Sequence, residues 1–534
     1  MNQRLVPAQR AALAIAALLL AHPAELLAAT HPQRPASQAA GYLPPTFHDP
    51  DRAGKVRALT GQITKIYTDF AAEAHCPGVA FGVVVDDALV VSGGLGYTDI
   101  RARTPATTRS VFRIASMTKS FTALSVLRLR DQGRIDLDRP LSGYLPEMRG
   151  LKGLTSDSPA ITARHLLTHG GGFPEDNPWG DRQLADTEQQ LIDLIRGPIR
   201  FSTSTGTEYE YSNVGFAVLG RLVHRVSGST CQDYIDRNVL RPLGMASTYW
   251  QPAKVPPDLL AHGYRWLDGE WREESLLADG SYAPMGGLMT SIEDFSRYMA
   301  LHLAAWPPRD DAENGPLRRS SLREMHHPWR MNALDTGAMD PQGKPCPTAG
   351  AYAYGLGWSR DCQQRVSIGH GGGLPGFGSN WRIYPEHGFG VVSFGNVTYA
   401  GISRANRKVA DLLLTVGELH PRRLPPSGIL RQRARELTRL LPAWADAEHS
   451  GLFAQNFFLD YPIASLRRDA QGLFDGIGDV VSEGEVEPEN QLRGTFLVHG
   501  KKGDVRLTFT LTPENPPLIQ EFSIVRIPEP DSAK

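Results

Sequence analysis

The sequence predicts an α+β fold in which one antiparallel sheet is flanked by helices and interrupted by a mainly helical insertion. Strand-like runs occupy residues 78–91, and they return at residues 366–396. Between them, from about residue 131 to residue 279, helical patterns alternate with long loops rich in glycine, proline and tryptophan. Strands near both ends of a domain, with helices between them, favour a single sheet closed by its first and last strands.

The length and composition indicate a globular protein with more than one domain. The chain has 534 residues, of which 41% are hydrophobic and 21% are charged. This length allows a large hydrophobic core. The formal net charge is −1, so the composition points neither to nucleic acid nor to an anionic membrane surface as a partner.

Residues 1–29 have the features of a secretory signal peptide. Arg4 and Arg10 are positive, and an apolar run follows from Ala11 to Ala21. This run is much shorter than the roughly 20 residues that span a bilayer, so we expect no stable membrane insertion, with uncleaved anchoring as the alternative. Export predicts a periplasmic or secreted protein. Residues 30–50 are rich in Pro, Ala, Gln and His and are expected to form a linker.

Residues 51–416 are predicted to form the main domain. Two β-rich runs flank an Asp-Asp pair that begins at Asp86, which is typical of a hairpin. The clearest helical patterns of the insertion are residues 189–194 and 214–226, and Ser291 precedes a further helix as its N-cap. Near the end of the domain, residues 384–388 have the composition of a hairpin turn.

Residues 429–534 are predicted to form a small C-terminal α+β domain, after a linker at residues 417–428 that is rich in proline and arginine. Helical patterns precede patterns that alternate like antiparallel strands. The helices are expected at residues 429–440 and 452–458, and the strands at residues 491–499, 505–511 and 518–524. This order resembles a cystatin-like cone, with a small β-barrel as the alternative. Because the region shows no catalytic constellation, we expect it to support or gate a site in the main domain.

The chain has four cysteines: Cys76, Cys231, Cys346 and Cys362. Cys346 and Cys362 flank one short segment and can pair after export, whereas the alternative is four free or buried thiols.

Ser116 and Lys119 are the first candidates for catalytic chemistry. A helical apolar pattern begins at Phe121, so Ser116 is predicted to lie at a helix N-terminus, where polar residues cap well. Lys119 comes one turn later on the same face, where its amine can reach the Ser116 hydroxyl. A serine becomes a strong nucleophile when a neighbouring base takes its proton, and a lysine can do so if desolvation lowers its pKa.

Two later motifs complete the candidate site. Tyr211 and Asn213 form the only Tyr-x-Asn of the chain, in a segment rich in turn formers. His370, Gly371 and Gly372 follow a strand-like run. Small residues at that point let a strand edge approach a substrate closely.

The order Ser-x-x-Lys, Tyr-x-Asn and a basic residue followed by glycines resembles the serine β-lactamase and penicillin-binding-protein family. It is most similar to the branch that holds class C β-lactamases, D-Ala-D-Ala carboxypeptidases and β-lactamase-like esterases. Stretches of the same kind occur at residues 165–172, 284–291 and 376–381, so the resemblance covers roughly residues 55 to 415. It implies a β-lactamase/transpeptidase-like fold with the site between the sheet and the helical insertion.

The resemblance also implies acyl transfer through a covalent serine ester. Ser116 would attack a carbonyl carbon, and Lys119 and the Tyr211 phenol would share the removal of its proton, in an order that stays open. Asn213 would donate an amide hydrogen bond to Lys119 or to the substrate.

Two further roles follow from the resemblance. The backbone N–H groups of Ser116 and Gly373 would form the oxyanion hole. His370 would bind a substrate carboxylate or assist proton transfer. Because histidine stands where the family has lysine, that positive charge depends on pH, which weakens the prediction of a dedicated β-lactamase.

Two sequence patterns resemble a metal site and a nucleotide site, but neither has the context that such a site requires. His165 and His169 are four residues apart, but no carboxylate lies between them, so His169 is expected to open a glycine-rich loop. Gly371, Gly373 and Gly376 match a dinucleotide fingerprint, yet they precede a strand instead of a helix. We therefore expect no metal and no cofactor.

The sequence thus predicts a serine hydrolase that acts on a small-molecule or peptide substrate. A D-Ala-D-Ala-type peptidase or a small-ester esterase is favoured, with a β-lactamase as the alternative. The rival of another class is a non-catalytic binding or regulatory relative of the fold. The substrate and the oligomeric state stay open, because the loops that shape a pocket have no readable code.

Overall fold

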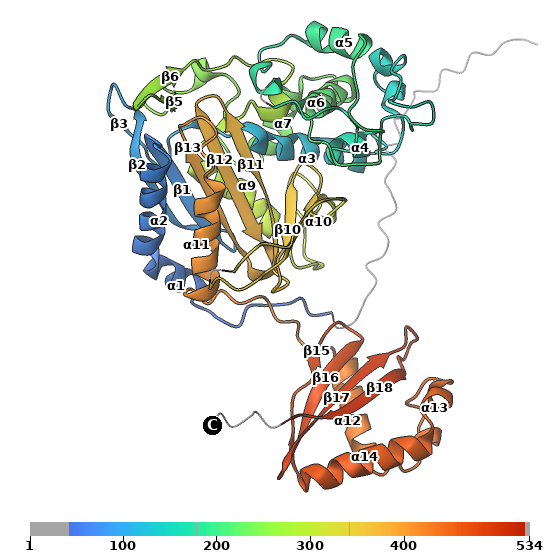
Figure 1. Ribbon diagram of the computed structural model, residues 1–534. Coiled ribbons are helices and arrows are strands. Elements are labelled where there is room, and N and C mark those ends of the chain that lie inside the picture. Colours follow the sequence, from blue (N-terminus) through green and yellow to red (C-terminus); the bar gives the residue numbers. More distant parts are fainter. Residues whose placement is uncertain (1–41, 178, 341, 529–534) are drawn as a thin grey trace, which may run out of the picture. The chain divides into compact units, whose positions relative to one another are not determined.

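The computed structural model describes residues 42–528, except residues 178 and 341. A nine-stranded sheet, antiparallel throughout, forms the centre of the larger domain (Figure 1). In spatial order its strands are β3 (Thr104–Pro105), β2 (Ala88–Asp99), β1 (Gly78–Val85), β13 (Phe389–Gly395), β12 (Phe377–Tyr384), β11 (Val366–Leu374), β10 (Gly357–Arg360), β9 (Thr348–Tyr352) and β8 (Arg330–Asp335). The predicted closure is confirmed, because β1 pairs with β13 and places Val79 opposite Gly395.

Strand β1 has helices on both of its faces, which explains why its residues are all buried. Phe81 belongs to a hydrophobic cluster with the helices on one face, and Ala80 belongs to the cluster on the other face. The helices are α1 (Arg52–Ala58), α2 (Thr60–Glu73) and α11 (Ser403–Thr415) on the first face, with α3 (Thr118–Asp131), α9 (Ile292–Leu303) and α10 (Arg319–Met325) in the other cluster. A strand buried on both faces reads as a continuous run of apolar residues, as this one does.

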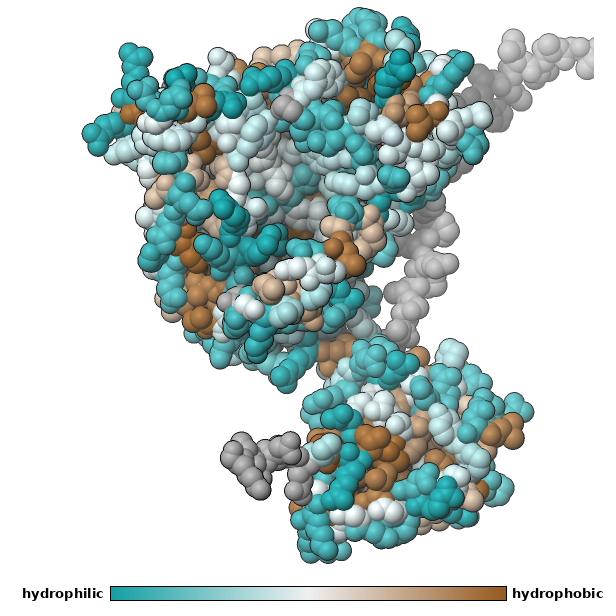
Figure 2. Space-filling view, viewed as in Figure 1, coloured by the Kyte–Doolittle hydropathy of each residue, from teal (hydrophilic) through white to brown (hydrophobic). Residues whose placement is uncertain are grey.

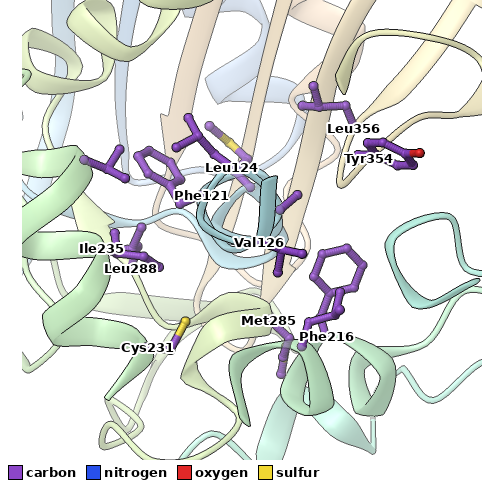
Figure 3. Close-up of a cluster of buried hydrophobic side chains, with 14 of the residues drawn as sticks. Phe121, Leu124, Val126, Phe216, Cys231, Ile235, Met285, Leu288, Tyr354 and Leu356 are labelled. Carbon is purple, nitrogen blue, oxygen red and sulfur yellow. The ribbon is translucent and has the colours of Figure 1, made fainter. Parts of the chain in front are cut away.

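Helix α3 passes through the largest hydrophobic cluster of the protein. Side chains from several elements surround it, including Phe216, Met285 and Leu356 (Figure 3). The hydroxyl groups of its buried serine and threonine residues donate hydrogen bonds to backbone carbonyls. Thr122, for example, donates to the Pro284 carbonyl at 2.7 Å. Burial on every side fixes the direction of the helix, and with it the position of the residues at its N-terminus.

The helical insertion predicted from the sequence is present. Its helices are α4 (Ala163–Leu167), α5 (Glu188–Arg196), α6 (Asn213–Ser227), α7 (Cys231–Ile235) and α8 (Ala283–Gly286), and two small ribbons pair β4 (Phe112–Arg113) with β7 (Met289–Thr290) and β5 (Gly263–Leu267) with β6 (Glu270–Glu274). The helix expectations for α5, for α6 and for the N-cap Ser291 of α9 are confirmed.

The sheet extends further than the two strand-like regions of the sequence, residues 78–91 and 366–396, indicated. Residues 325–365, expected to supply pocket loops, also contribute strands. These strands are β8, β9 and β10. Five of the six β8 residues are exposed, so this strand lacks the alternation of buried and exposed residues that reveals a strand in a sequence. A disulfide joins Cys346 to Cys362 beside these strands, as expected, while Cys76 and Cys231 are free and buried.

The C-terminal domain has its own sheet and its own hydrophobic core. Its elements are α12 (Gly428–Leu440), α13 (Phe457–Asp460), α14 (Ile463–Ile477), β14 (Val480–Glu483), β15 (Glu487–Pro488), β16 (Arg493–Gly500), β17 (Gly503–Leu511) and β18 (Ile519–Arg526). One expectation was wrong: residues 452–458 are mostly irregular, and the long helix is α14. Phe453 fills the core from the irregular residues and Phe457 from the first residue of α13, so their apolar spacing imitated one continuous helix.

The predicted signal peptide, and most of the linker at residues 30–50, lie outside the described residues. Within the described part of the chain, no helix is long and apolar enough to cross a membrane. Hydrophilic residues cover most of the visible face of the larger domain, with hydrophobic residues in separate small patches (Figure 2).

Candidate active site

Ser116 lies in a tight turn directly before α3. Residues 115–117 form a single 3₁₀ turn, and Ala115 adopts a left-handed conformation with φ of 48°. Ser116 thus lies at the N-terminal end of α3, as expected, and its Oγ accepts a hydrogen bond from Lys119. Backbone strain of this kind occurs where surrounding structure holds a side chain in a special direction. Ser116 is 8% exposed, so its hydroxyl is nearly but not fully enclosed.

The ammonium group of Lys119 has three acceptors around it, all within 3.0 Å. Its Nζ donates to Ser116 Oγ at 3.0 Å, to Asn213 Oδ1 at 2.7 Å and to the Met285 carbonyl at 2.9 Å. The side chain is fully buried. Burial lowers the pKa of Lys119 to about 7, and the carboxylates of Asp181 and Asp176 oppose this effect only in part. A substantial fraction of the amine is therefore neutral near physiological pH.

Tyr211 stands beside this pair. Lys119 Nζ lies 4.8 Å from the centroid of its ring. Burial raises the pKa of Tyr211 well above its usual value, and interaction with the Ser116 side chain lowers it only in part. The phenol is consequently protonated near neutral pH, so it is suited to give a proton rather than to remove one.

Asn213 begins α6 and has a different orientation from the predicted one. Its Oδ1 accepts the hydrogen bond from Lys119, and its Nδ2 donates to Asn177 Oδ1 at 2.5 Å. The prediction that the amide donates to Lys119 was wrong, because a buried lysine amine directed at it requires an acceptor. The backbone here is held by Asp176, whose carboxylate accepts from the N–H groups of Asn213 and Val214 at 2.6 and 2.9 Å.

Strand β11 brings the third motif next to the serine. A Cβ atom on Gly372 would lie 2.2 Å from the Ile114 carbonyl oxygen and 3.0 Å from the Ala115 Cβ, so only glycine allows the strand to approach the turn this closely. The ladder between β10 and β11 ends at Gly369, which leaves the following residues of β11 unpaired on that side. Gly371 and Gly373 belong to this open edge.

His370 is neutral in this environment. Its Nδ1 lies 2.5 Å from the Gly371 carbonyl oxygen and therefore carries the proton, while its Nε2 accepts from the Tyr352 hydroxyl at 2.8 Å. Burial, and to a smaller degree the nearby charge of Lys119, lower the pKa of His370 to about 4. The positive charge, which was expected to depend on pH, is thus absent near neutral pH, so a substrate carboxylate would meet a neutral ring.

The sequence did not identify three residues that shape the site. His169 is buried beneath Tyr211, with 4.2 Å between the ring centroids. Tyr399 covers Gly373 and donates from its hydroxyl to Asp181 Oδ2 at 2.9 Å. No signal marked Asp181 or Tyr399, because both come from loops that meet only in the folded protein. His169 had a signal, since it precedes three glycines, but the spacing suggested only a loop.

A cavity of about 330 Å³ opens beside Tyr211 and His370. Aromatic side chains supply much of its wall: Tyr209, Tyr211, Tyr352, Trp358 and Trp381. Amide and guanidinium groups of Asn332, Asn380 and Arg382 also line it. Among the described residues, no group of three or more His, Cys, Asp or Glu side chains is arranged to hold a metal ion.

The structure therefore assembles the predicted residues from three distant segments: Ser116 with Lys119, Tyr211 with Asn213, and the strand from His370 to Gly373. Comparison with known proteins extends this picture. The family model described as Beta-lactamase matches residues 63–415. The chain is 27% identical over 342 residues to "Protein flp" of Staphylococcus aureus (strain N315), a match that covers 63% of this chain and 63% of that protein. It is 33% identical over 207 residues to "Beta-lactamase-like protein 2" of Dictyostelium discoideum, covering 37% of each.

Solved structures share the fold. The octameric penicillin-binding protein homologue from Pyrococcus abyssi aligns with a TM-score of 0.56 at 20% identity, over 88% of this chain and 96% of that one. A class C β-lactamase aligns with a TM-score of 0.53 at 19% identity, over 69% of this chain and 98% of that one. The predicted β-lactamase/transpeptidase-like fold is confirmed. Since the family model matches well over half of the residues, the chain belongs to the β-lactamase family.

Proposed function

We propose that the protein is a serine hydrolase that cleaves an ester or amide through an acyl-enzyme on Ser116. One observation carries this proposal: a fully buried lysine amine, with its pKa lowered to about 7, lies 3.0 Å from the Ser116 hydroxyl. An amine with this pKa is well matched to general-base catalysis near neutral pH. Of the two candidate bases, Lys119 is the better supported, because Tyr211 keeps its proton.

The proposed reaction starts when Ser116 Oγ attacks the carbonyl carbon and its proton passes to the neutral Lys119 amine. The bond to the leaving group then breaks, and the leaving oxygen or nitrogen takes a proton that Lys119 supplies through the Tyr211 phenol. Water attacks the resulting ester, gives its proton to Lys119 and releases the acid, and Ser116 regains its hydrogen. Each step keeps the transferred proton on groups that already lie together.

The N–H groups of Ser116 and Gly373 are proposed to hold the oxyanion. The close approach of Gly372 to the serine turn supports this role, because it brings the β11 edge beside the nucleophile. Losing one such donor typically costs about 10² to 10³ in rate.

The charges around the site favour a leaving group without a carboxylate. His370 is neutral, and the buried carboxylates of Asp176 and Asp181 lie on the side of Lys119. The Arg382 guanidinium in the cavity wall already donates to Ser367 Oγ at 3.2 Å. D-Ala-D-Ala peptides and β-lactams both carry a carboxylate that needs a cation. Of the two activities favoured from the sequence, hydrolysis of small neutral esters or amides is therefore the better supported.

Covalent labelling tests the acyl-enzyme. Purified protein treated with a fluorophosphonate is expected to gain one adduct by intact mass, and Ser116→Ala is expected to gain none. Equal labelling of both proteins, or none of the wild type, would contradict the proposal and favour a non-catalytic relative of the fold.

A matched substrate pair tests the charge preference. We expect a peptide amide that ends in D-alaninamide, and p-nitrophenyl butyrate, to be cleaved at least about tenfold faster than the same peptide with a free C-terminal carboxylate, and faster than nitrocefin. Faster cleavage of the carboxylate forms would show that the site supplies a cation after all.

We also propose that the protein is exported. The Cys346–Cys362 disulfide supports this, because structural disulfides form and persist in oxidising compartments. Fractionation of expressing cells, with the N-terminal residue of the protein determined by mass spectrometry, tests it. A cytoplasmic protein that retains residues 1–29 would contradict it.

A further inference from the structure

His169 is linked to Tyr211 by contacts on three sides. Its carbonyl oxygen accepts from the N–H of Glu210 at 2.8 Å, and its Nδ1 accepts from the N–H of Ser212 at 3.0 Å. One residue therefore holds the backbone immediately before and immediately after Tyr211. Its ring also packs on the Tyr211 ring, with centroids 4.2 Å apart.

The same ring touches the other half of the site. The centroid of Tyr352 lies 4.4 Å from that of His169, and the Tyr352 hydroxyl donates to His370. His169 thus contacts both Tyr211 and the tyrosine that orients His370. Its contacts therefore join the segment just before α6 to Tyr352 of β9, whose hydroxyl bonds to His370 of β11.

Two costs show that packing alone does not explain the residue. His169 has a φ of 52°, in the left-handed region that L side chains rarely adopt. Its Nε2 is buried and finds no hydrogen-bond partner among the described residues, although the ring carries its proton there because Nδ1 is an acceptor. Phenylalanine would fill the same space without a buried polar atom, but it would leave the Ser212 N–H unpaired.

We propose that His169 is a positioning residue for the proposed hydrolysis, which fixes the Tyr211 phenol relative to Ser116 and Lys119. This inference rests on the proposed function. It assigns to His169 no contact with the substrate and no proton transfer. A displacement of about 1 Å in a group of this kind can cost about 10² in rate.

Three substitutions separate positioning from packing. Asparagine places Oδ1 where Nδ1 lies and tolerates a left-handed backbone, so His169→Asn retains the acceptor. His169→Gln has an amide of similar size that cannot put an oxygen at that point, and His169→Phe retains the ring without the acceptor. His165→Phe is the matched control, because the His165 ring bonds to Thr162 in the capping box of α4, away from Tyr211.

The measurement is the rate of acylation by p-nitrophenyl butyrate, per active site counted with a fluorophosphonate, across pH 5 to 9. We expect His169→Gln and His169→Phe to lose about 10- to 100-fold in kcat with KM changed less than about threefold. His169→Asn and His165→Phe should stay within about threefold of the wild type. In the two slow variants the midpoint of the acid limb should stay near the wild-type value, because burial and the nearby carboxylates set the pKa of Lys119 and the Tyr211 phenol does not.

The proposal is overturned if all three His169 variants lose activity equally, or if none loses it once folded sites are counted. Failure of the proposed function looks different, because wild-type protein would then fail to react with the fluorophosphonate at all. A variant that unfolds is recognised by its lost near-UV circular dichroism, and the comparison of His169→Asn with His169→Gln then still decides.

Discussion

Two buried polar clusters lie within the core of the larger domain, and they differ in what they touch. The first joins Lys119 to Ser116, Asn213 and the Met285 carbonyl. The second joins two histidines: His302 Nδ1 lies 2.7 Å from His326 Nε2. Burial lowers the pKa of the basic groups in both clusters, to about 7 for Lys119 and to about 3 for His326.

The histidine cluster is enclosed by aromatic rings. Trp306 Nε1 donates to His326 Nδ1 at 3.0 Å, so His326 carries its proton on Nε2 and donates it to His302. The rings of Tyr298 and Trp381 lie 4.6 and 5.2 Å from that of His302. The described side chains around these two histidines include no serine hydroxyl placed beside a strand edge of glycines, as Ser116 is. A strongly lowered pKa therefore occurs both in the candidate active site and in a sealed hydrogen-bonded core. The two clusters are distinguished by the Ser116 hydroxyl, which lies beside Lys119 and has no counterpart among those side chains that a histidine of the second cluster could activate.

Replacement of the lysine is expected to have the largest effect on activity. Lys119→Met should lower kcat/KM for a p-nitrophenyl ester by about 10³ or more, because Ser116 loses the group that takes its proton. The midpoint of thermal unfolding should stay within about 5 °C of the wild type, since a buried amine is replaced by an apolar chain of similar length. Lys152→Met, at an exposed position, is the control and should be unchanged. Retained activity in Lys119→Met would reduce the first cluster to a structural role like that of the second.

Removal of the tyrosine hydroxyl sharpens the assignment of the base. Tyr211→Phe is expected to lower kcat by about 10- to 10²-fold, because proton delivery to the leaving group is lost. The matched control is Tyr209→Phe in the wall of the same cavity, which should stay within about threefold.

The pH profile of these proteins separates the two candidate bases. Below a pKa of about 7 the Lys119 amine is protonated and has no free electron pair, so kcat/KM should fall about tenfold per pH unit below that value and level off above it. Tyr211→Phe should keep this acid limb. If the limb vanishes with the phenol, Tyr211 is the base.

A charge introduced on the strand edge should change selectivity more modestly. His370→Lys is expected to raise kcat/KM for nitrocefin about tenfold, because a cation then faces the substrate carboxylate, and to alter a neutral ester less than about threefold. His370→Gln, which stays neutral, is the control and should leave nitrocefin near the wild-type rate. A marked loss in His370→Gln would mean that the histidine already binds the carboxylate.

The smallest effect on activity is expected in the second cluster. His326→Phe removes the partners of the Trp306 and His302 nitrogens and should destabilise the protein by about 2–4 kcal/mol, as measured by denaturant unfolding. Activity per folded molecule should stay within about twofold. His327→Ala, at the exposed neighbouring position, should change neither quantity. A loss of kcat in folded His326→Phe would link the two clusters.

Local patterns predicted much of the fold. The hairpin of β1 and β2, helices α5, α6 and α9, and strands β11 to β13 all have periodicity or turn residues that suffice by themselves. The strand β8 escaped prediction because it is almost entirely exposed and lacks alternation. Helix α14 was missed although Ala470, Phe474 and Ile477 have helical spacing, because the aromatic run at residues 452–458 drew the helix prediction to the segment before it.

The sequence alone determined the pairing of Ser116 with Lys119, because a separation of three residues at the start of a helix places both side chains on one face. The tertiary structure decided the protonation states and the direction of the hydrogen bonds. His370 is neutral and Asn213 is an acceptor because of groups that come from other parts of the chain, such as Tyr352 and the buried Lys119. Desolvation and neighbouring charges set a pKa, and both arise only when distant segments pack together.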